Sequence, residues 1–334
     1  MSELVAHDDA QRDQDRDRDR DRARTWAWVA GRLADGSRVT GSSRLRGGFT
    51  SEMRRLRVEG PEGAEELVLR SFVAPFYLRH AEGLLTREAD ILTLLGADGG
   101  GVPVATLRGV DATGEFCAYP SLLMTLLPGT VRVDEEELDR RCRLLAGQLV
   151  RIHRVDVPED ARPRDYQAWV TPEGVRRPAG SARPEVWERA VEVIRRPPPS
   201  FPGRFLHRDY HPGNVLFSGG GSTGELRITG VVDWVETSWG PADLDVAHCS
   251  TALALLYGVP AGMAFAGRYL EAGGDLAAEP ADHLYWRLLD ALAFAPDAEK
   301  VGVSWRELGR TDLTPALLAG RLEEYVEELL KRFG

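Results

Sequence analysis

Residues 205–217 decide the fold of this 334-residue chain, and they read Phe205-Leu206-His207-Arg208-Asp209-Tyr210-His211-Pro212-Gly213-Asn214-Val215-Leu216-Phe217. Apolar residues lead into a polar loop, and an apolar run leaves it. This alternation predicts a loop of polar side chains after a buried segment, with a strand to follow. A further apolar strand, Ile228–Val232, ends directly at Asp233.

The spacing within the loop, His-Arg-Asp and then an Asn after four intervening residues, has a chemical reason. An Asp must face the hydroxyl group that attacks a γ-phosphoryl group, and an Asn one loop turn later holds Mg²⁺ on the phosphates. A second carboxylate is then needed on the metal, and Asp233 supplies it. The sequence therefore predicts a phosphotransfer site with Asp209 as the base and with Asn214 and Asp233 as ligands of Mg²⁺.

Composition narrows the class of protein. With 43% hydrophobic and 28% charged residues, the chain can bury a core and form two lobes. The net charge of -10 argues against a nucleic-acid partner and favours a cationic small substrate. Cys117, Cys142 and Cys249 lack metal or disulfide spacing, which indicates a reducing compartment. Because we see neither a signal peptide nor a run of about 20 apolar residues, we expect a cytoplasmic protein without a membrane partner.

Patterning along the chain predicts an α+β fold in three parts. Residues 1–24 form an Arg/Asp-rich tail that should be disordered, residues 25–127 a small antiparallel-sheet lobe, and residues 128–334 a large helical lobe. Strands are expected at 38–45, 53–59, 66–72, 106–110, 116–119 and 122–127, with a hairpin turn at 60–63. Helices are expected at 25–33, 80–95, 184–194, 261–272, 280–294 and 315–332, from about 134 to 153, and after Asp245 to about 257. The Pro/Gly/Arg-rich segment 162–183 is expected to be irregular.

The N-terminal lobe offers candidates for nucleotide binding. Gly47 and Gly48 link two antiparallel strands, where backbone N–H groups can approach phosphates. Arg70 lies near the end of the third strand and could reach the α- and β-phosphates, with Glu88 of the following helix as its partner. The apolar strand through Met124 and Leu126 ends at a Pro-Gly turn, where an adenine ring could meet backbone groups.

Taken together, these motifs resemble the aminoglycoside phosphotransferase family, which is related to protein kinases. The similarity extends from about residue 40 to the end of the chain and is most specific in His207–Asn214 together with Asp233. It implies a bilobal protein-kinase-like fold and transfer of the γ-phosphoryl group of Mg²⁺·ATP to a hydroxyl group of a small molecule. It also implies that Asp245 braces the catalytic loop and that His207 packs beneath the metal carboxylate.

The same resemblance implies the roles of the remaining residues. Arg70, steadied by Glu88, would contact the ATP phosphates, and the backbone from Met124 to Leu126 would receive the adenine. Arg70 stands where many members carry lysine, which leaves GTP as an alternative nucleotide. Asp233 is followed by Trp-Val, and the short chain beyond it has no Ala-Pro-Glu motif, which argues against a protein substrate.

Alternatives remain open at this point. His207, Asp209 and His211 could belong to a metal hydrolase, although the other histidines form no second cluster. A pseudokinase that binds a nucleotide or metabolite without turnover is the main non-enzymatic alternative. The acceptor could be an antibiotic, or a metabolite of the choline, homoserine, sugar or ketosamine type. The acids that could meet a polyamine in the helical lobe are Glu236, Asp290, Asp297 and Glu299.

Overall fold

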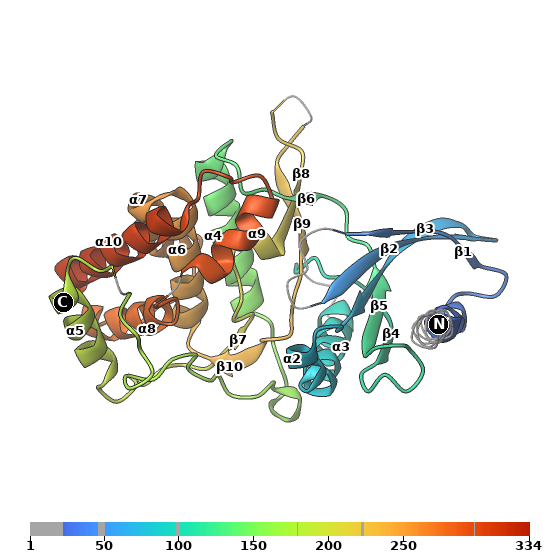
Figure 1. Cartoon of the computed structure of the whole chain (residues 1–334), viewed down its shortest axis with the longest axis horizontal. Helices are drawn as coiled ribbons and strands as arrows, with labels where there is room; N and C mark the ends of the chain where they lie inside the picture. The colour runs from blue at the N-terminus through green and yellow to red at the C-terminus, as the bar shows by residue number, and fades with distance from the viewer. Residues whose placement is uncertain (1–22, 46–50, 98–100, 179, 222–223, 297) are drawn as a thin grey trace, which may run out of the picture. The chain divides into compact units, whose positions relative to one another are not determined.

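The computed structural model describes residues 23–45, 51–97, 101–178, 180–221, 224–296 and 298–334 (Figure 1). The described residues fall into two compact units. We call residues 23–97 with 105–126 the sheet unit, and residues 101–104 with 127–334 the helical unit. The Arg/Asp-rich segment before residue 23 lies outside the described part of the chain.

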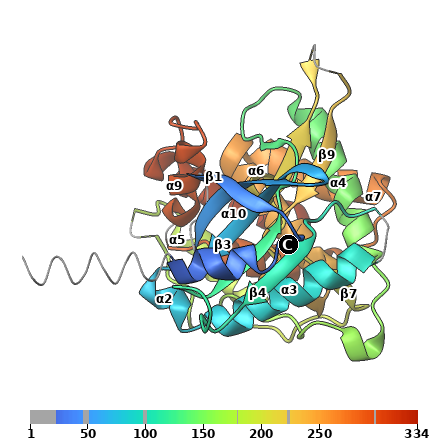
Figure 2. The ribbon, with the colours of Figure 1, turned by 90° about the vertical axis from the view of Figure 1, so that its right-hand side faces the viewer.

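Five antiparallel strands in the order β1-β2-β3-β5-β4 form the sheet unit (Figure 2). They are β1 (Arg38–Arg44), β2 (Glu52–Gly60), β3 (Gly63–Ser71), β4 (Leu107–Asp111) and β5 (Ser121–Thr125). Gly60 pairs with Gly63, which confirms the predicted hairpin turn. Side chains along β2 and β3 point alternately to the two faces of the sheet. On one face, Leu56, Leu67 and Leu69 are buried together with residues 28 and 29 of a helix at 23–30. Two helices complete the unit, α2 (Pro75–Leu78) and α3 (Ala81–Ala97).

One predicted strand of the sheet unit is wrong. Residues 116–119 form a loop, because the carboxylate of Asp111 accepts hydrogen bonds from the backbone N–H groups of Glu115, Phe116 and Cys117 at 3.0, 3.0 and 2.7 Å. Those amides are therefore unavailable to a strand ladder. The aromatic residues that suggested a strand are exposed, Phe116 by 54% and Tyr119 by 43%.

Helices dominate the helical unit. They are α4 (Leu138–His153), α5 (Pro184–Ile194), α6 (Ala242–Tyr257), α7 (Val259–Glu271), α8 (Pro280–Leu292), α9 (Glu299–Glu307) and α10 (Pro315–Phe333). Helix α9 was not predicted, and α4 begins after the acidic run 134–137 that was expected to form its first turn. Helix α6 is buried along nearly its whole length, and its side chains join those of α8 and α10 in the main core. Among the described residues, no helix is long and apolar enough to cross a membrane.

Short strands of the helical unit carry the polar loops. Strand β7 (Arg204–Leu206) pairs with β10 (Ser238–Gly240), and β6 (Thr130–Val131), β8 (Val215–Ser218) and β9 (Arg227–Val231) form a second small sheet. The 3₁₀ turns η1 (Glu159–Ala161) and η2 (Pro212–Asn214) complete the elements. Because β8 and β9 are antiparallel, the start of one and the end of the other lie side by side. This arrangement places Asn214 next to the segment that carries Asp233.

Candidate active site

Asp245, at the start of α6, fixes the backbone of the loop that follows β7. Its fully buried carboxylate accepts hydrogen bonds from the backbone N–H of His207 at 2.8 Å and of Arg208 at 2.7 Å, and contacts His153 Nε2 at 3.1 Å. Burial alone would raise the pKa of Asp245, but its hydrogen bond and charge interaction with His153 lower it. Asp245 therefore braces the loop, as the family resemblance implied. His207 is also buried, against Trp234, with ring centroids 4.4 Å apart.

Two residues of the site have strained backbones. Arg208 has a φ of 71° and Asp233 a φ of 66°, in the left-handed region that residues other than glycine rarely adopt. Arg208 is held there by Asp245 and by its guanidinium group, which lies 4.2 Å from the centroid of the Trp169 ring. Strain of this kind persists only where the surroundings over-determine the conformation, and it is concentrated at functional sites.

The structure brings Asp209, Asn214 and the end of β9 together. The side-chain amide of Asn214 donates to the backbone O and to Oδ2 of Asp209 at 2.9 and 3.0 Å. The backbone N–H of Val232, next to Asp233, donates to the backbone O of Asn214 at 3.0 Å. With its nitrogen turned to Asp209, the Asn214 amide keeps its oxygen for a cation. An amide oxygen and a carboxylate are hard ligands of the type that Mg²⁺ takes, so these residues fit the predicted metal.

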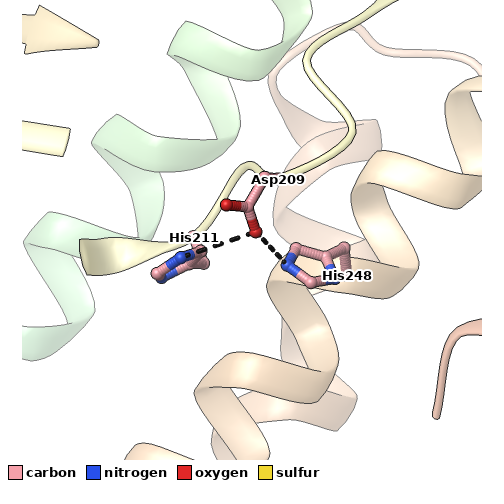
Figure 3. A group of neighbouring side chains, drawn as sticks. All are labelled: Asp209, His211 and His248. Atoms are coloured by element: carbon pink, nitrogen blue, oxygen red, sulfur yellow. Dashed lines mark hydrogen bonds and ion pairs between the residues drawn. The ribbon is translucent and has the colours of Figure 1, made fainter. Parts of the chain in front are cut away.

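A histidine outside the predicted site residues, His248, holds the Asp209 carboxylate as well (Figure 3). His248 Nε2 lies 3.0 Å from Asp209 Oδ1, and His248 Nδ1 lies 3.0 Å from Oδ1 of the buried Asp290 on α8. The other oxygen of Asp290 accepts a hydrogen bond from Thr251 at 2.7 Å. His211 Nε2 lies 3.7 Å from Asp209 Oδ1. His248 therefore joins Asp209 and His211 of the loop motif in one group, a contact that the sequence did not predict.

Electrostatics make His248 the cation of this group. Burial opposes its charge, but the carboxylates of Asp290 and Asp209 raise the pKa of His248 to about 9. Burial lowers the pKa of His211 to about 4, so that this ring is neutral at pH 7. Burial alone would raise the pKa of Asp209, but its interactions with His211 and His248 hold it below its usual range. A protonated imidazole thus lies between the carboxyl groups of Asp209 and Asp290.

We expect His248 to make the stability of the helical unit pH-dependent. A group whose pKa rises on folding, here from 6.5 to about 9, stabilises the fold fully below the lower value and ceases to do so above the higher one. The difference in unfolding free energy between wild type and His248→Gln should therefore shrink by about 3 kcal/mol between about pH 6 and about pH 10. Urea unfolding at both pH values measures it, with the exposed His80→Gln as the control. Parallel profiles of wild type and His248→Gln would contradict the charge assigned to His248.

The predicted Arg70–Glu88 pair is formed within the sheet unit. Arg70 Nη1 lies 2.9 Å from each carboxylate oxygen of Glu88, and Arg70 Nε donates to Ser51 Oγ at 3.1 Å. Both members of the pair are buried, with 3% and 2% of their surface exposed. Gly47 and Gly48 lie outside the described residues.

Some backbone groups around the end of β5 already form hydrogen bonds within the sheet. Met124 lies opposite Val68 of β3, and the N–H of Leu126 donates to Glu66 O at 2.9 Å. An adenine ring at this position would therefore be recognised by groups other than the Leu126 amide.

A pocket of about 140 Å³ opens beside Asp209 within the helical unit. Its lining consists mainly of aromatic and apolar side chains, namely Trp169, Asp209, His211, His248, Ala252, Phe294, Lys300, Val301 and Trp305. Trp169 comes from the irregular segment 162–183, and the last three come from α9. Sequence reasoning missed this wall. For His248 alone a signal was present, because it lies one helical turn after Asp245 on α6.

The acids that were expected to meet a polyamine are placed elsewhere. Asp290 is buried behind His248 rather than exposed to a ligand. Glu236 pairs with Arg164 at 2.7 Å, and Glu299 pairs with Arg306 at 3.0 Å. Asp297 lies outside the described residues.

Comparisons with known proteins show the family and the fold of the chain. A family model described as "Phosphotransferase enzyme family" matches residues 43–289. A search of curated proteins finds no match.

Solved structures with a similar fold include a putative aminoglycoside phosphotransferase from Ralstonia eutropha JMP134. It is 16% identical with a TM-score of 0.60, and the match covers 92% of this chain and 98% of that one. A second is the spectinomycin phosphotransferase APH(9)-Ia in complex with ADP and spectinomycin. It is 12% identical with a TM-score of 0.52, and the match covers 89% of this chain and 94% of that one. A third is APH(2")-IIia in complex with GDP and kanamycin, 14% identical with a TM-score of 0.53, with 88% of this chain and 94% of that one covered. Likeness at these identities shows the protein-kinase-like fold that the sequence predicted.

Proposed function

Because the chain belongs to the phosphotransferase enzyme family and is a small-molecule phosphotransferase, we propose that it transfers the γ-phosphoryl group of Mg²⁺·ATP to a hydroxyl group of its acceptor. One observation carries this proposal. The carboxylate of Asp209 lies in the wall of a ligand-sized pocket and is hydrogen-bonded to Asn214, whose backbone pairs with the strand end that carries Asp233. These contacts support Asp209 as the base and Asn214 and Asp233 as oxygen ligands of one Mg²⁺.

The proposed reaction is a direct in-line displacement. A bond forms between the acceptor oxygen and the γ-phosphorus, the bond from that phosphorus to the β,γ-bridging oxygen breaks, and ADP leaves. The acceptor proton passes to the Asp209 carboxylate. A carboxylate whose pKa is held below its usual range is a weak base, so Asp209 mainly orients the hydroxyl group and takes the proton late. His248 and Asn214 hold the carboxylate in place on its two sides.

Residues for the metal are assigned in the helical unit, and residues for the nucleotide are assigned in the sheet unit. When bound, Mg²⁺ would neutralise developing charge on the phosphates, and Asn214 and Asp233 would hold it. Arg70, fixed by Glu88, would contact the phosphates, the Gly47-Gly48 turn would approach them, and the segment from Met124 to Leu126 would receive the base. Similar structures contain ADP or GDP, which supports ATP with GTP as an alternative.

Incubation of the full chain with Mg²⁺·ATP and a mixed acceptor panel tests the proposal. The panel holds aminoglycosides, macrolides, amino alcohols and sugars, and mass spectrometry follows a gain of one phosphoryl group with ADP released in equal amount. A parallel incubation with GTP decides the nucleotide. ADP and product should appear together and disappear when EDTA removes the metal. Tight Mg²⁺·ATP binding without product from any acceptor would contradict the proposed transfer.

A further inference from the structure

We propose that Arg208 is a positioning residue for the acceptor: its side chain holds the indole ring of Trp169 in the wall of the pocket beside Asp209. This inference rests on the proposed function and adds a residue that governs how tightly the acceptor binds. Arg208 lies inside the loop motif, directly before Asp209. The proposed reaction gives its side chain no part in proton or phosphoryl transfer, so that side chain is available for this role.

The guanidinium group of Arg208 is buried against the chain segment that carries Trp169. Only 3% of the Arg208 surface is exposed, and its guanidinium carbon lies 4.2 Å from the centroid of the Trp169 ring. Its Nη2 donates a hydrogen bond to the backbone O of Gln167 at 3.2 Å. Among the described residues, its Nη1 finds no hydrogen-bond partner. Contact with the Trp169 ring therefore supplies part of what this buried charge loses in hydration.

The backbone at Arg208 indicates that this side chain is needed. Its φ of 71° lies in the left-handed region, which glycine adopts without strain and arginine does not. The backbone N–H of this residue donates to Asp245 at 2.7 Å, a bond that any residue except proline could form. Neither the loop conformation nor its brace therefore requires arginine. The contacts of the Arg208 side chain give the reason for the strained residue.

Trp169 depends on such contacts for its position in the pocket. Its side chain is 40% exposed, and residues 166–171 around it form neither helix nor strand. Arg208 covers one face of the indole, and the His248 ring meets the indole edge-on, with centroids 5.1 Å apart. Because an indole can turn about two side-chain torsions, contacts on its face and its edge select one rotamer.

A fixed indole lowers the cost of binding an acceptor. Trp169 and Asp209 line the same pocket, and His248 contacts both. A flat apolar wall that is already in place buries the face of a bound molecule without being ordered at the moment of binding. This gain is the same before and during the transfer step. Its loss should therefore raise the acceptor KM and leave kcat unchanged.

Fluorine NMR of the full chain, with 5-fluorotryptophan at its eight tryptophan positions, tests the anchor without nucleotide or acceptor. Trp169→Phe and Trp28→Phe identify two of the signals. Arg208→Gly suits the φ of 71° and keeps the N–H bond to Asp245, and it should shift the Trp169 signal towards its value in the unfolded chain. The matched control is Arg32→Met, which removes a guanidinium group 5.2 Å from the Trp28 ring centroid in the sheet unit. It should move the Trp28 signal and leave that of Trp169 in place.

Kinetics with Mg²⁺·ATP and each panel acceptor that gains a phosphoryl group test the consequence. Arg208→Gly should raise the acceptor KM roughly three- to thirtyfold, the range of a cation–π contact, while kcat and the KM of Mg²⁺·ATP keep their wild-type values. Arg208→Lys should give an intermediate acceptor KM, because lysine keeps the charge but lacks the planar group. Trp169→Ala leaves the loop intact and should raise the acceptor KM at least as much, and adding Arg208→Gly to it should have little further effect. Arg32→Met should leave all three constants unchanged.

Three results would overturn the proposal. A Trp169 signal that stays in place in Arg208→Gly contradicts the anchor. A lower kcat at an unchanged acceptor KM places Arg208 in the transfer step instead, and additive effects of Arg208→Gly and Trp169→Ala show that the two residues act independently. If Arg208→Gly does not fold, the same measurements on Arg208→Lys decide. If no panel member is phosphorylated, the proposed function falls and the acceptor role of Arg208 with it, while the fluorine signal still reports on the anchor alone.

Discussion

Asp209→Asn should lower kcat by roughly 10² to 10⁴-fold, the contribution usual for a general base, while Mg²⁺·ATP still binds. An amide cannot accept the acceptor proton, and its NH₂ group would face the donor of either His248 or Asn214, which now hold the carboxylate at 3.0 Å each. The variant therefore loses both the base and its orientation. Steady-state kinetics with the identified acceptor, together with nucleotide binding by calorimetry, measures the two effects separately.

A matched control for this substitution is Asp275→Asn, which removes a carboxylate from an exposed loop between α7 and α8. It should retain wild-type kcat. Turnover of Asp209→Asn at the wild-type rate would remove Asp209 from the catalytic role. If Asp209→Asn lowered the melting temperature but kept wild-type turnover, Asp209 would have a structural role only.

Asp233→Ala should abolish the Mg²⁺-dependent part of ATP affinity, because it removes the carboxylate assigned to the metal. Since Asp233 has a φ of 66°, alanine would also strain the backbone there. Asp233→Asn separates the two effects, because asparagine tolerates this conformation and keeps the volume but loses the charge. Calorimetric titration of ATP with and without Mg²⁺ measures both variants. Unchanged Mg²⁺·ATP affinity in both would contradict the assignment of Asp233.

Local patterns predicted much of the fold. The strand-like runs and the glycine-containing turn between them predicted the β2–β3 hairpin, and Pro184 marked the first residue of α5. Helix α9 was missed, because it is short and mostly polar and buries only Gly302 and Trp305. The strand expected at 116–119 failed because a single carboxylate, that of Asp111, took the amides.

For the site, the sequence revealed the residues of the loop motif, Asp209 and Asn214. In the sheet unit it also revealed the Arg70–Glu88 pair. It could not reveal the contact between His248 and Asp290, because those residues lie on different helices and meet only when α6 packs on α8. Nor could it show that Asp290, an acid in an amphipathic segment, is buried. Such pairings depend on tertiary packing, which local spacing does not encode.

In the proposed function, the chemistry and the choice of acceptor come from different parts of this protein. Helix α6 holds both the backbone of the catalytic loop, through Asp245, and the carboxylate of Asp209, through His248. The outer wall of the pocket comes instead from Trp169 in an irregular segment and from α9. Evolution or engineering can therefore rewrite these two segments to admit new molecules while the transfer machinery stays untouched.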